Sequence, residues 1–182
     1  MEKRVIVMTF DENSKAYEAF AKLKNESRLG KIEVEQLAVV ENVKGEGFKI
    51  LEGADLTGSD RLFAGGLIGA FVGMIGGPLG LLLGWTTGSL IGSVGDIREV
   101  EEANSAFSRT ANVLTEESVG LIAIASEFSP NVLDTLIKEE LGGEVVRFTY
   151  SQVEAEIERA KETERELKKE ARRHWLKREK TE

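Results

Sequence analysis

The chain of 182 residues contains no cysteine, only one histidine and only two prolines. Without cysteine it can form neither a disulfide framework nor a cysteine-ligated zinc site, and it has no thiol nucleophile. Its single histidine, His174, excludes a cluster of histidine ligands and is typical of a solvated helix. The formal net charge of −8 argues against general nucleic-acid binding, which requires a basic surface.

Motifs that would mark an enzyme are also missing. The sequence has no Walker phosphate-binding loop, no complete dinucleotide-binding fingerprint and no nucleophile elbow. Glu99, Glu101 and Glu102 are potential ligands for a divalent cation, but such a run is more typical of a solvated helix face. We therefore expect no catalytic residue, no cofactor, no metal site and no enzymatic activity.

Charge is absent from one long central segment, "AGGLIGAFVGMIGGPLGLLLGWTTGSLIGSVG", residues 64–95. Its glycines recur every four residues in two rows, which are Gly65, Gly69, Gly73 and Gly77, and then Gly76, Gly80, Gly84, Gly88 and Gly92. A flexible linker has no reason to keep such spacing. Glycines four apart on a helix instead expose a strip of bare backbone that allows close helix packing.

Pro78 divides this segment, because proline breaks a continuous helix. The sequence predicts two helices, over about 62–76 and 79–95, each roughly 24 Å long. They would form a hairpin, with Trp85 in a packing or interfacial position. Three arrangements remain open: a hairpin that dips into lipid, one that just spans it, and hairpins of several subunits packed without lipid. The free face of the predicted sheet is too small to cover both helices, which argues against burial within one subunit.

The remaining sequence predicts strands over 4–10, 31–43, 48–51, 119–126 and 144–150, with helices over 13–27, 96–118 and 129–141. Removing residues 53–118 leaves the split β-α-β pattern of ferredoxin-like folds. We expect a four-stranded antiparallel sheet with two helices on one face. A partner subunit, the inserted helix or the C-terminal helix must cover the other face.

The predicted fold class is therefore α+β, a ferredoxin-like sheet with an inserted glycine-zipper hairpin and a long charged C-terminal helix. We divide the chain into a discontinuous ferredoxin-like domain (1–52 and 119–150), the apolar hairpin (53–95), an amphipathic connecting helix (96–118) and the C-terminal helix (151–182).

The C-terminal helix begins with a potential capping box, Ser151 and Glu154. Its thin apolar stripe consists of Val153, Ile157, Ala160, Leu167, Ala171 and Trp175. A basic cluster follows, formed by Lys168, Lys169, Arg172, Arg173, Lys177 and Arg178 around Trp175. Two explanations remain open, namely contact with anionic lipid headgroups and the solvated end of a coiled coil.

Three segments together resemble a known family: "RVIVMTFDE", "DLTGSDRLFAGGLIGAFVGMIGGPLGLLLGWTTGSLIG" and "EVVRFTYSQVEAEIERAKE". The chain resembles, over nearly its whole length, the bacterial domain-of-unknown-function family 1269. Members of that family look like membrane-annotated proteins with a glycine-zipper hairpin. The chain departs from outer-membrane lipoproteins with glycine zippers, because it has no signal sequence and no lipidation cysteine. The resemblance implies no activity and no functional residue.

These observations favour a non-enzymatic, self-assembling protein at the cytoplasmic face of the cell membrane, acting in membrane support, remodelling under stress or pore formation. Its expected partners are further copies of itself and membrane lipid, with no nucleic acid and no small-molecule substrate. One alternative is a soluble cytoplasmic homo-oligomeric shell or cage with a lipid-free apolar core. A second is a ferredoxin-like small-molecule sensor.

Overall fold

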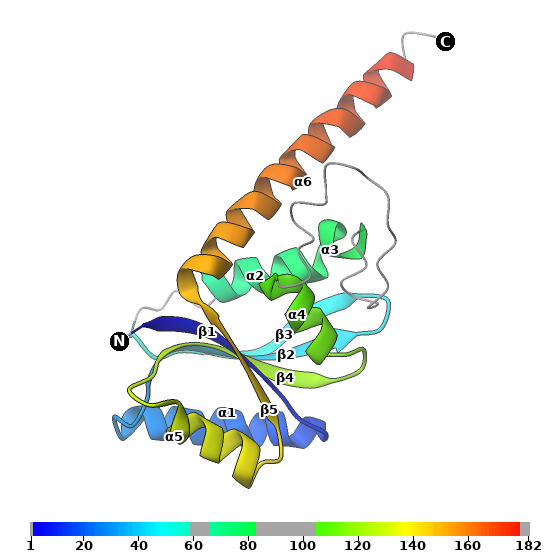
Figure 1. Ribbon diagram of the computed structural model, residues 1–182. Helices are drawn as coiled ribbons and strands as arrows, with labels where there is room; N and C mark the ends of the chain where they lie inside the picture. Colours follow the sequence, from blue (N-terminus) through cyan, green and yellow to red (C-terminus); the bar gives the residue numbers. More distant parts are fainter. Residues whose placement is uncertain (1, 59–65, 83–104, 179–182) are drawn as a thin grey trace.

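The computed structural model describes residues 2–58, 66–82 and 105–178. Over these residues the fold is α+β, with an antiparallel sheet between two layers of helices (Figure 1). In chain order the elements are β1 (Lys3–Thr9), α1 (Asn13–Arg28), β2 (Glu33–Val43), β3 (Gly47–Asp55), α2 (Leu67–Gly76), α3 (Pro78–Leu82), α4 (Ala106–Val113), β4 (Val119–Ser126), α5 (Pro130–Asp134), the π-helix η2 (Thr135–Glu140), β5 (Glu144–Thr149) and α6 (Tyr150–Arg178).

The sheet has the strand order β3-β2-β4-β1-β5, and every neighbouring pair is antiparallel. The expected sheet of four strands is wrong. The strand predicted over 48–51 forms β3, which joins the sheet as a fifth strand at its edge. This strand continues to Asp55, beyond the end that we predicted at residue 51, since pairing with β2 extends from Val43↔Gly47 to Gln36↔Asp55. Gly45 and Gly47 have positive φ angles of 73° and 80°, which allow the tight turn between the two strands.

The first face of the sheet is covered by α1, α5 and η2 (Figure 1). Their buried side chains include Phe20 and Leu23 from α1 and Leu133 and Ile137 from α5 and η2. The predicted helices 13–27 and 129–141 are thus confirmed, except that the second changes from α-helical to π-helical geometry at Thr135. Central strand β4 is buried along its whole length, as expected for a strand covered on both faces.

The second face is covered by α2, α4 and the first half of α6 (Figure 1). Among the described residues, the cover therefore comes from the inserted and C-terminal helices, two of the three sources that the sequence left open. The two apolar clusters have separate members, with Val5 and Val7 of β1 facing this second layer and Ile6 and Met8 facing the first. This alternation follows the two-residue period of a strand.

Several predicted helix ends are wrong. The first helix of the hairpin was expected over about 62–76, but α2 begins at Leu67, after the N-cap Gly66. The connecting helix was expected over 96–118, but its described part begins at Ala106, after the N-cap Ser105, and ends at Val113. The backbone leaves the helix at Leu114, whose carbonyl accepts a hydrogen bond from the Asn42 side chain at 2.9 Å. In the C-terminal helix, Ser151 lies inside α6, and Thr149 Oγ1 instead accepts the hydrogen bond of the Gln152 N–H at 3.2 Å.

Candidate interaction surface

Helix α2 lies on the second face of the sheet, where its inner side is covered by protein. Ile68, Phe71, Val72 and Ile75 are at most 3% exposed. The Phe71 ring stacks on Phe107 of α4, with 5.1 Å between centroids. In this conformation the first half of the glycine-rich segment therefore requires neither lipid nor a second subunit to cover its large side chains. The second face of the sheet is large enough to cover one of the two helices predicted for the hairpin.

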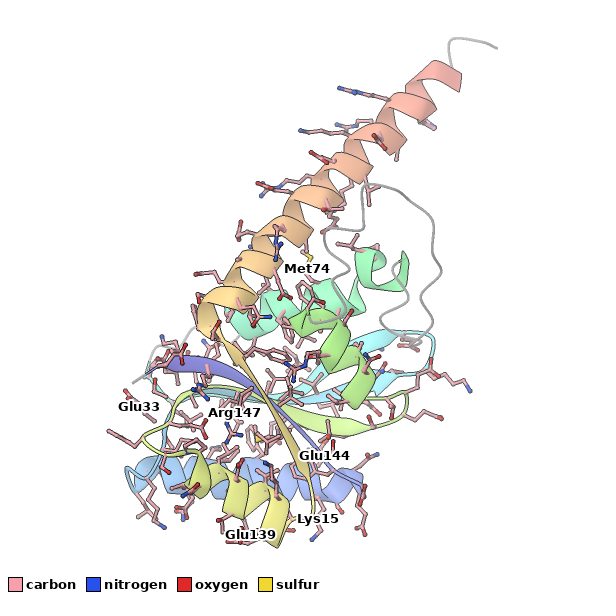
Figure 2. The ribbon with its side chains drawn as sticks, viewed as in Figure 1. Lys15, Glu33, Met74, Glu139, Glu144 and Arg147 are labelled. Carbon is pink, nitrogen blue, oxygen red and sulfur yellow. The ribbon has the colours of Figure 1, made fainter. Side chains whose placement is uncertain are left out.

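The outer side of α2 is also apolar. Its sequence, LIGAFVGMIG, has no polar side chain, and Leu67, Gly69, Ala70 and Met74 are half-buried while Gly73 is exposed. Met74 projects from α2 beside α6 (Figure 2). A helix at the surface of a water-soluble domain normally has a polar outer side. The outer side of α2 is therefore the first feature of the fold that points to a contact with something other than water.

The glycines of the two rows do not share one role. A Cβ atom on Gly76 would lie 2.6 Å from the Phe48 carbonyl oxygen, so this glycine allows α2 to approach β3. A Cβ on Gly73 would meet nothing within 4 Å. Gly77 and Gly80 lie where the chain bends between α2 and α3. A Cβ atom on Gly77 would clash with the backbone carbonyl oxygen of Gly73, and one on Gly80 with that of Ile75. Of these glycines, Gly76 therefore packs against the sheet, Gly73 faces open space, and Gly77 and Gly80 lie in the bend.

The second half of the predicted hairpin lies mostly outside the described residues. Pro78, which we placed in the bend, is the first residue of α3, one residue before the predicted start, and α3 is described to Leu82. Gly65, Gly84, Gly88, Gly92 and Trp85 lie outside the described residues, as do Glu99, Glu101 and Glu102. Among the described helices, none combines the length and the apolar character needed to cross a bilayer.

A buried carboxylate joins α4 to α6. Glu156 is 6% exposed, and its two oxygens accept hydrogen bonds from the Ala106 backbone N–H at 2.8 Å and from Gln152 Nε2 at 2.9 Å. A carboxylate at this position is favoured by the partial positive charge of a helix N-terminus. Our sequence analysis missed Glu156, although its spacing from Val153 and Ala160 places it on the buried stripe.

The second half of α6 extends beyond the body of the molecule (Figure 1). Val153, Ile157 and Ala160 are buried against the sheet layer, Leu167 is partly buried, and Ala171 and Trp175 are exposed. The predicted apolar stripe is therefore covered in its first half only. Trp175 is 60% exposed, which is unusual for so large an apolar side chain.

The basic residues of the predicted cluster lie on this exposed part of α6. Lys168 pairs with Glu164 at 2.6 Å, and its side chain is still 72% exposed. Lys169, Arg172 and Arg173 are exposed and form no ion pair with another described residue. Lys177 lies in the last turn and Arg178 ends the helix, but their side chains are outside the described part of the structure.

On the opposite layer, a groove of about 780 Å³ lies between α1 and the α5–η2 helix. Its polar lining includes Lys22, Asn25, Lys31, Asn131 and Thr135. Lys22 bridges the groove by pairing with Glu140 at 3.0 Å, and Lys31 pairs with Glu26 at 2.8 Å. Because its cations are already neutralised and most of its lining is exposed, the groove supports no specific ligand.

The sequence analysis also missed an ion-pair network around Arg147 of β5. Arg147, between β5 and α5 (Figure 2), binds both carboxylate oxygens of Glu127, at 2.7 and 2.9 Å, and pairs with Asp134 at 2.9 Å. The Glu127 hydrogen bonds raise the pKa of Arg147 above its ordinary value. Burial acts to raise the pKa of Asp134, but hydrogen bonds from Arg147 and Lys138 outweigh it, and the pKa is lowered. The network fixes α5 to the sheet.

Within the described part of the chain, no group of three or more potential metal-binding side chains occurs. Comparisons with protein-family models, with curated proteins and with solved structures found no match to this chain. The resemblance to domain-of-unknown-function family 1269 therefore stays a prediction. The outer side of α2 and the exposed half of α6 are left as the candidate functional surface.

Proposed function

We propose that the protein is a non-enzymatic, self-assembling protein that associates with membranes through the layer formed by α2, α3 and α6. The observation that carries this proposal is the apolar outer side of α2. In sequence, the uncharged segment continues beyond Leu82 to residue 95, so α2 is only the first part of a longer apolar region. A region of this size requires a cover of lipid or of other subunits.

The proposed body of the protein is ferredoxin-like, with β3 as an additional edge strand. The order β2-β4-β1-β5 supports this assignment, because it has the two central strands and the two outer strands of a split β-α-β fold. Helices α1 and α5–η2 connect the strands of the two units on one face. In this proposal the other face has been adapted to carry the membrane-associated layer.

The burial of α2 favours contact with one side of a membrane over a spanning hairpin. While α2 remains on the sheet, the uncharged residues available beyond α3 are 83–95. Even a complete helix of that length would measure roughly 20 Å, which is less than the ~30 Å of a hydrocarbon core. We therefore propose insertion at the interface, with the polar body on one side.

A lipid-free assembly is the second candidate, and one specific observation favours it. The inner side of α2 is covered by protein, so the buried side chains of this helix need no lipid, which supports cover by protein for the outer side as well. In such an assembly the outer sides of α2 from several subunits would cover one another. A homo-oligomeric shell or cage would then form around an apolar interior.

The test is purification of the full chain without detergent, followed by measurement of particle mass, phospholipid phosphate and flotation with vesicles. We expect homo-oligomers that carry phosphate or float with added vesicles. Uniform particles without phosphate that do not float would favour the lipid-free assembly. A monomer that binds no vesicles would contradict both candidates.

A substitution at Gly73 separates assembly from folding. Gly73→Leu should leave the subunit folded, because the position is open, but it should weaken contacts made through the outer side of α2. Ala21→Leu on α1 adds similar bulk to an exposed position on the opposite layer and is the control. Equal assembly of both variants would exclude close packing at Gly73.

A further inference from the structure

Residues 165–175 of α6 are divided into three sectors, and Lys177 and Arg178 lie outside the basic one. At about 100° per residue, Arg165, Lys168, Lys169, Arg172 and Arg173 fall within an arc of about 140°. Leu167, Ala171 and Trp175 occupy a neighbouring arc of about 80°, and Glu166 and Glu170 lie on the remaining side. A basic sector that directly adjoins an apolar one is typical of helices that lie at a membrane interface.

The unpaired cations make this surface complementary to a negatively charged one. Lys169, Arg172 and Arg173 are exposed and have no acidic partner among the described residues. In a solvated helix, by contrast, opposite charges commonly pair along the surface, as Lys161 pairs with Glu158 at 2.9 Å nearer the body. The last ion pair among the described residues of α6 is Lys168 with Glu164, and the cations that follow it are unpaired.

The apolar sector identifies the partner as lipid. Trp175 is 60% exposed, and tryptophan is enriched at the interface between lipid and water. A thin layer of anionic headgroups over an apolar interior matches both sectors of the helix.

We propose that the exposed half of α6 binds the surface of an anionic bilayer, with Lys169, Arg172 and Arg173 on the headgroups and Trp175 inserted at the interface. This inference rests on the proposed membrane association and assigns it a lipid class. Through the partly buried Leu167, the apolar stripe of the exposed half of α6 continues the stripe that packs on the body. The body is then held at a fixed orientation to the bilayer.

The experiment uses the full chain with vesicles of phosphatidylcholine alone and vesicles that also contain phosphatidylglycerol. We expect binding to the anionic vesicles to be stronger and to decrease as salt rises, because salt screens exposed charges. The triple variant Lys169→Glu, Arg172→Glu, Arg173→Glu should bind anionic vesicles on the order of 100-fold more weakly. Circular dichroism and urea unfolding verify that this variant is folded.

A matched control changes the net charge equally at another surface. Lys24, Arg28 and Lys44 pair with no acid among the described residues, and their triple replacement by glutamate should leave vesicle binding within a few-fold of the parent chain. Equal losses in both variants would show that net charge alone governs binding and would overturn the proposed site.

The tryptophan supplies an independent readout. In a Trp85→Phe background, the emission of Trp175 should shift to shorter wavelength with anionic vesicles and stay unchanged with phosphatidylcholine alone. An unchanged spectrum with bound anionic vesicles would overturn the insertion of Trp175. Displacement of bound vesicles by duplex DNA at equal salt would assign the basic sector to nucleic acid and overturn the lipid assignment.

These outcomes separate this inference from the proposed function. If the α6 charge-reversal variant still floats equally with both vesicle types, membrane association stands and the role of α6 is wrong. If the parent chain binds no vesicles and remains a monomer, the proposed function itself fails.

Discussion

At the scale of single residues, Gly76 and Gly73 differ although they lie only three positions apart on one short helix. Gly76→Ala would place a Cβ 2.6 Å from the carbonyl oxygen and 2.8 Å from the nitrogen of Phe48. Because backbone atoms cannot yield easily, we expect a loss of about 1–3 kcal/mol in the free energy of unfolding.

Gly73→Ala is the matched control, since the added Cβ meets nothing within 4 Å. Removing glycine from a helix interior should stabilise the protein by about 0.5–1 kcal/mol. Urea unfolding of the two variants measures the difference. Equal effects at both positions would contradict the contact between α2 and β3.

Asp134 supplies a pH-dependent prediction. Its pKa is lowered in the folded protein, because the hydrogen bonds from Arg147 and Lys138 outweigh the effect of burial. A lowered folded-state pKa stabilises the protein above the unfolded-state pKa, and this contribution disappears as the pH falls through the folded-state value. Asp134→Asn should therefore reduce the free energy of unfolding at neutral pH and have progressively less effect in acid. A difference that is independent of pH would contradict the assigned ion pair.

At the scale of elements, the position of α4 depends on a side chain from α6. Glu156→Ala removes the acceptor of the Ala106 N–H in a buried region and should lower the free energy of unfolding by about 1–3 kcal/mol. The exposed Glu154 is the control, and its replacement by alanine should change stability by no more than about 0.5 kcal/mol. Hydrogen exchange at residues 106–113 should increase only in the first variant.

Sequence periodicity predicted the elements with one clear apolar side and was less informative about the others. The helical spacing of Ala16, Tyr17, Phe20 and Leu23 predicted α1 almost to the residue, although Tyr17 is 43% exposed. Helix α2 is apolar all round, so its pattern indicated a helix but did not indicate which side the protein covers. The extent of β3 depends on pairing with β2, and the site of Glu156 depends on where α4 begins, both of which are tertiary properties.

At the scale of the whole molecule, the central question is whether α2 stays on the sheet when the protein meets a membrane or another subunit. Its four buried side chains, Ile68, Phe71, Val72 and Ile75, contribute about 1.5–3 kcal/mol each. Lipid would bury the side chains of α2 equally well, but the part of the sheet beneath α2, including Phe48 of β3, would lose its cover. Because the sheet would lose cover while α2 would gain nothing, we expect α2 to stay on the sheet and its outer side to contact the membrane or the other subunit.

The absence of cysteine from the chain makes this idea directly testable. Met74 of α2 and Leu167 of α6 are both partly buried against the same apolar cluster. In a Met74→Cys, Leu167→Cys variant, a short bis-maleimide should bridge the two helices with equal efficiency in the presence and absence of vesicles. The bridged protein should bind vesicles and assemble as the unbridged protein does, with each single-cysteine variant as a control for labelling. If the bridge abolishes membrane binding, α2 must leave the sheet to insert, and both halves of the glycine-rich segment would then form the membrane-bound hairpin.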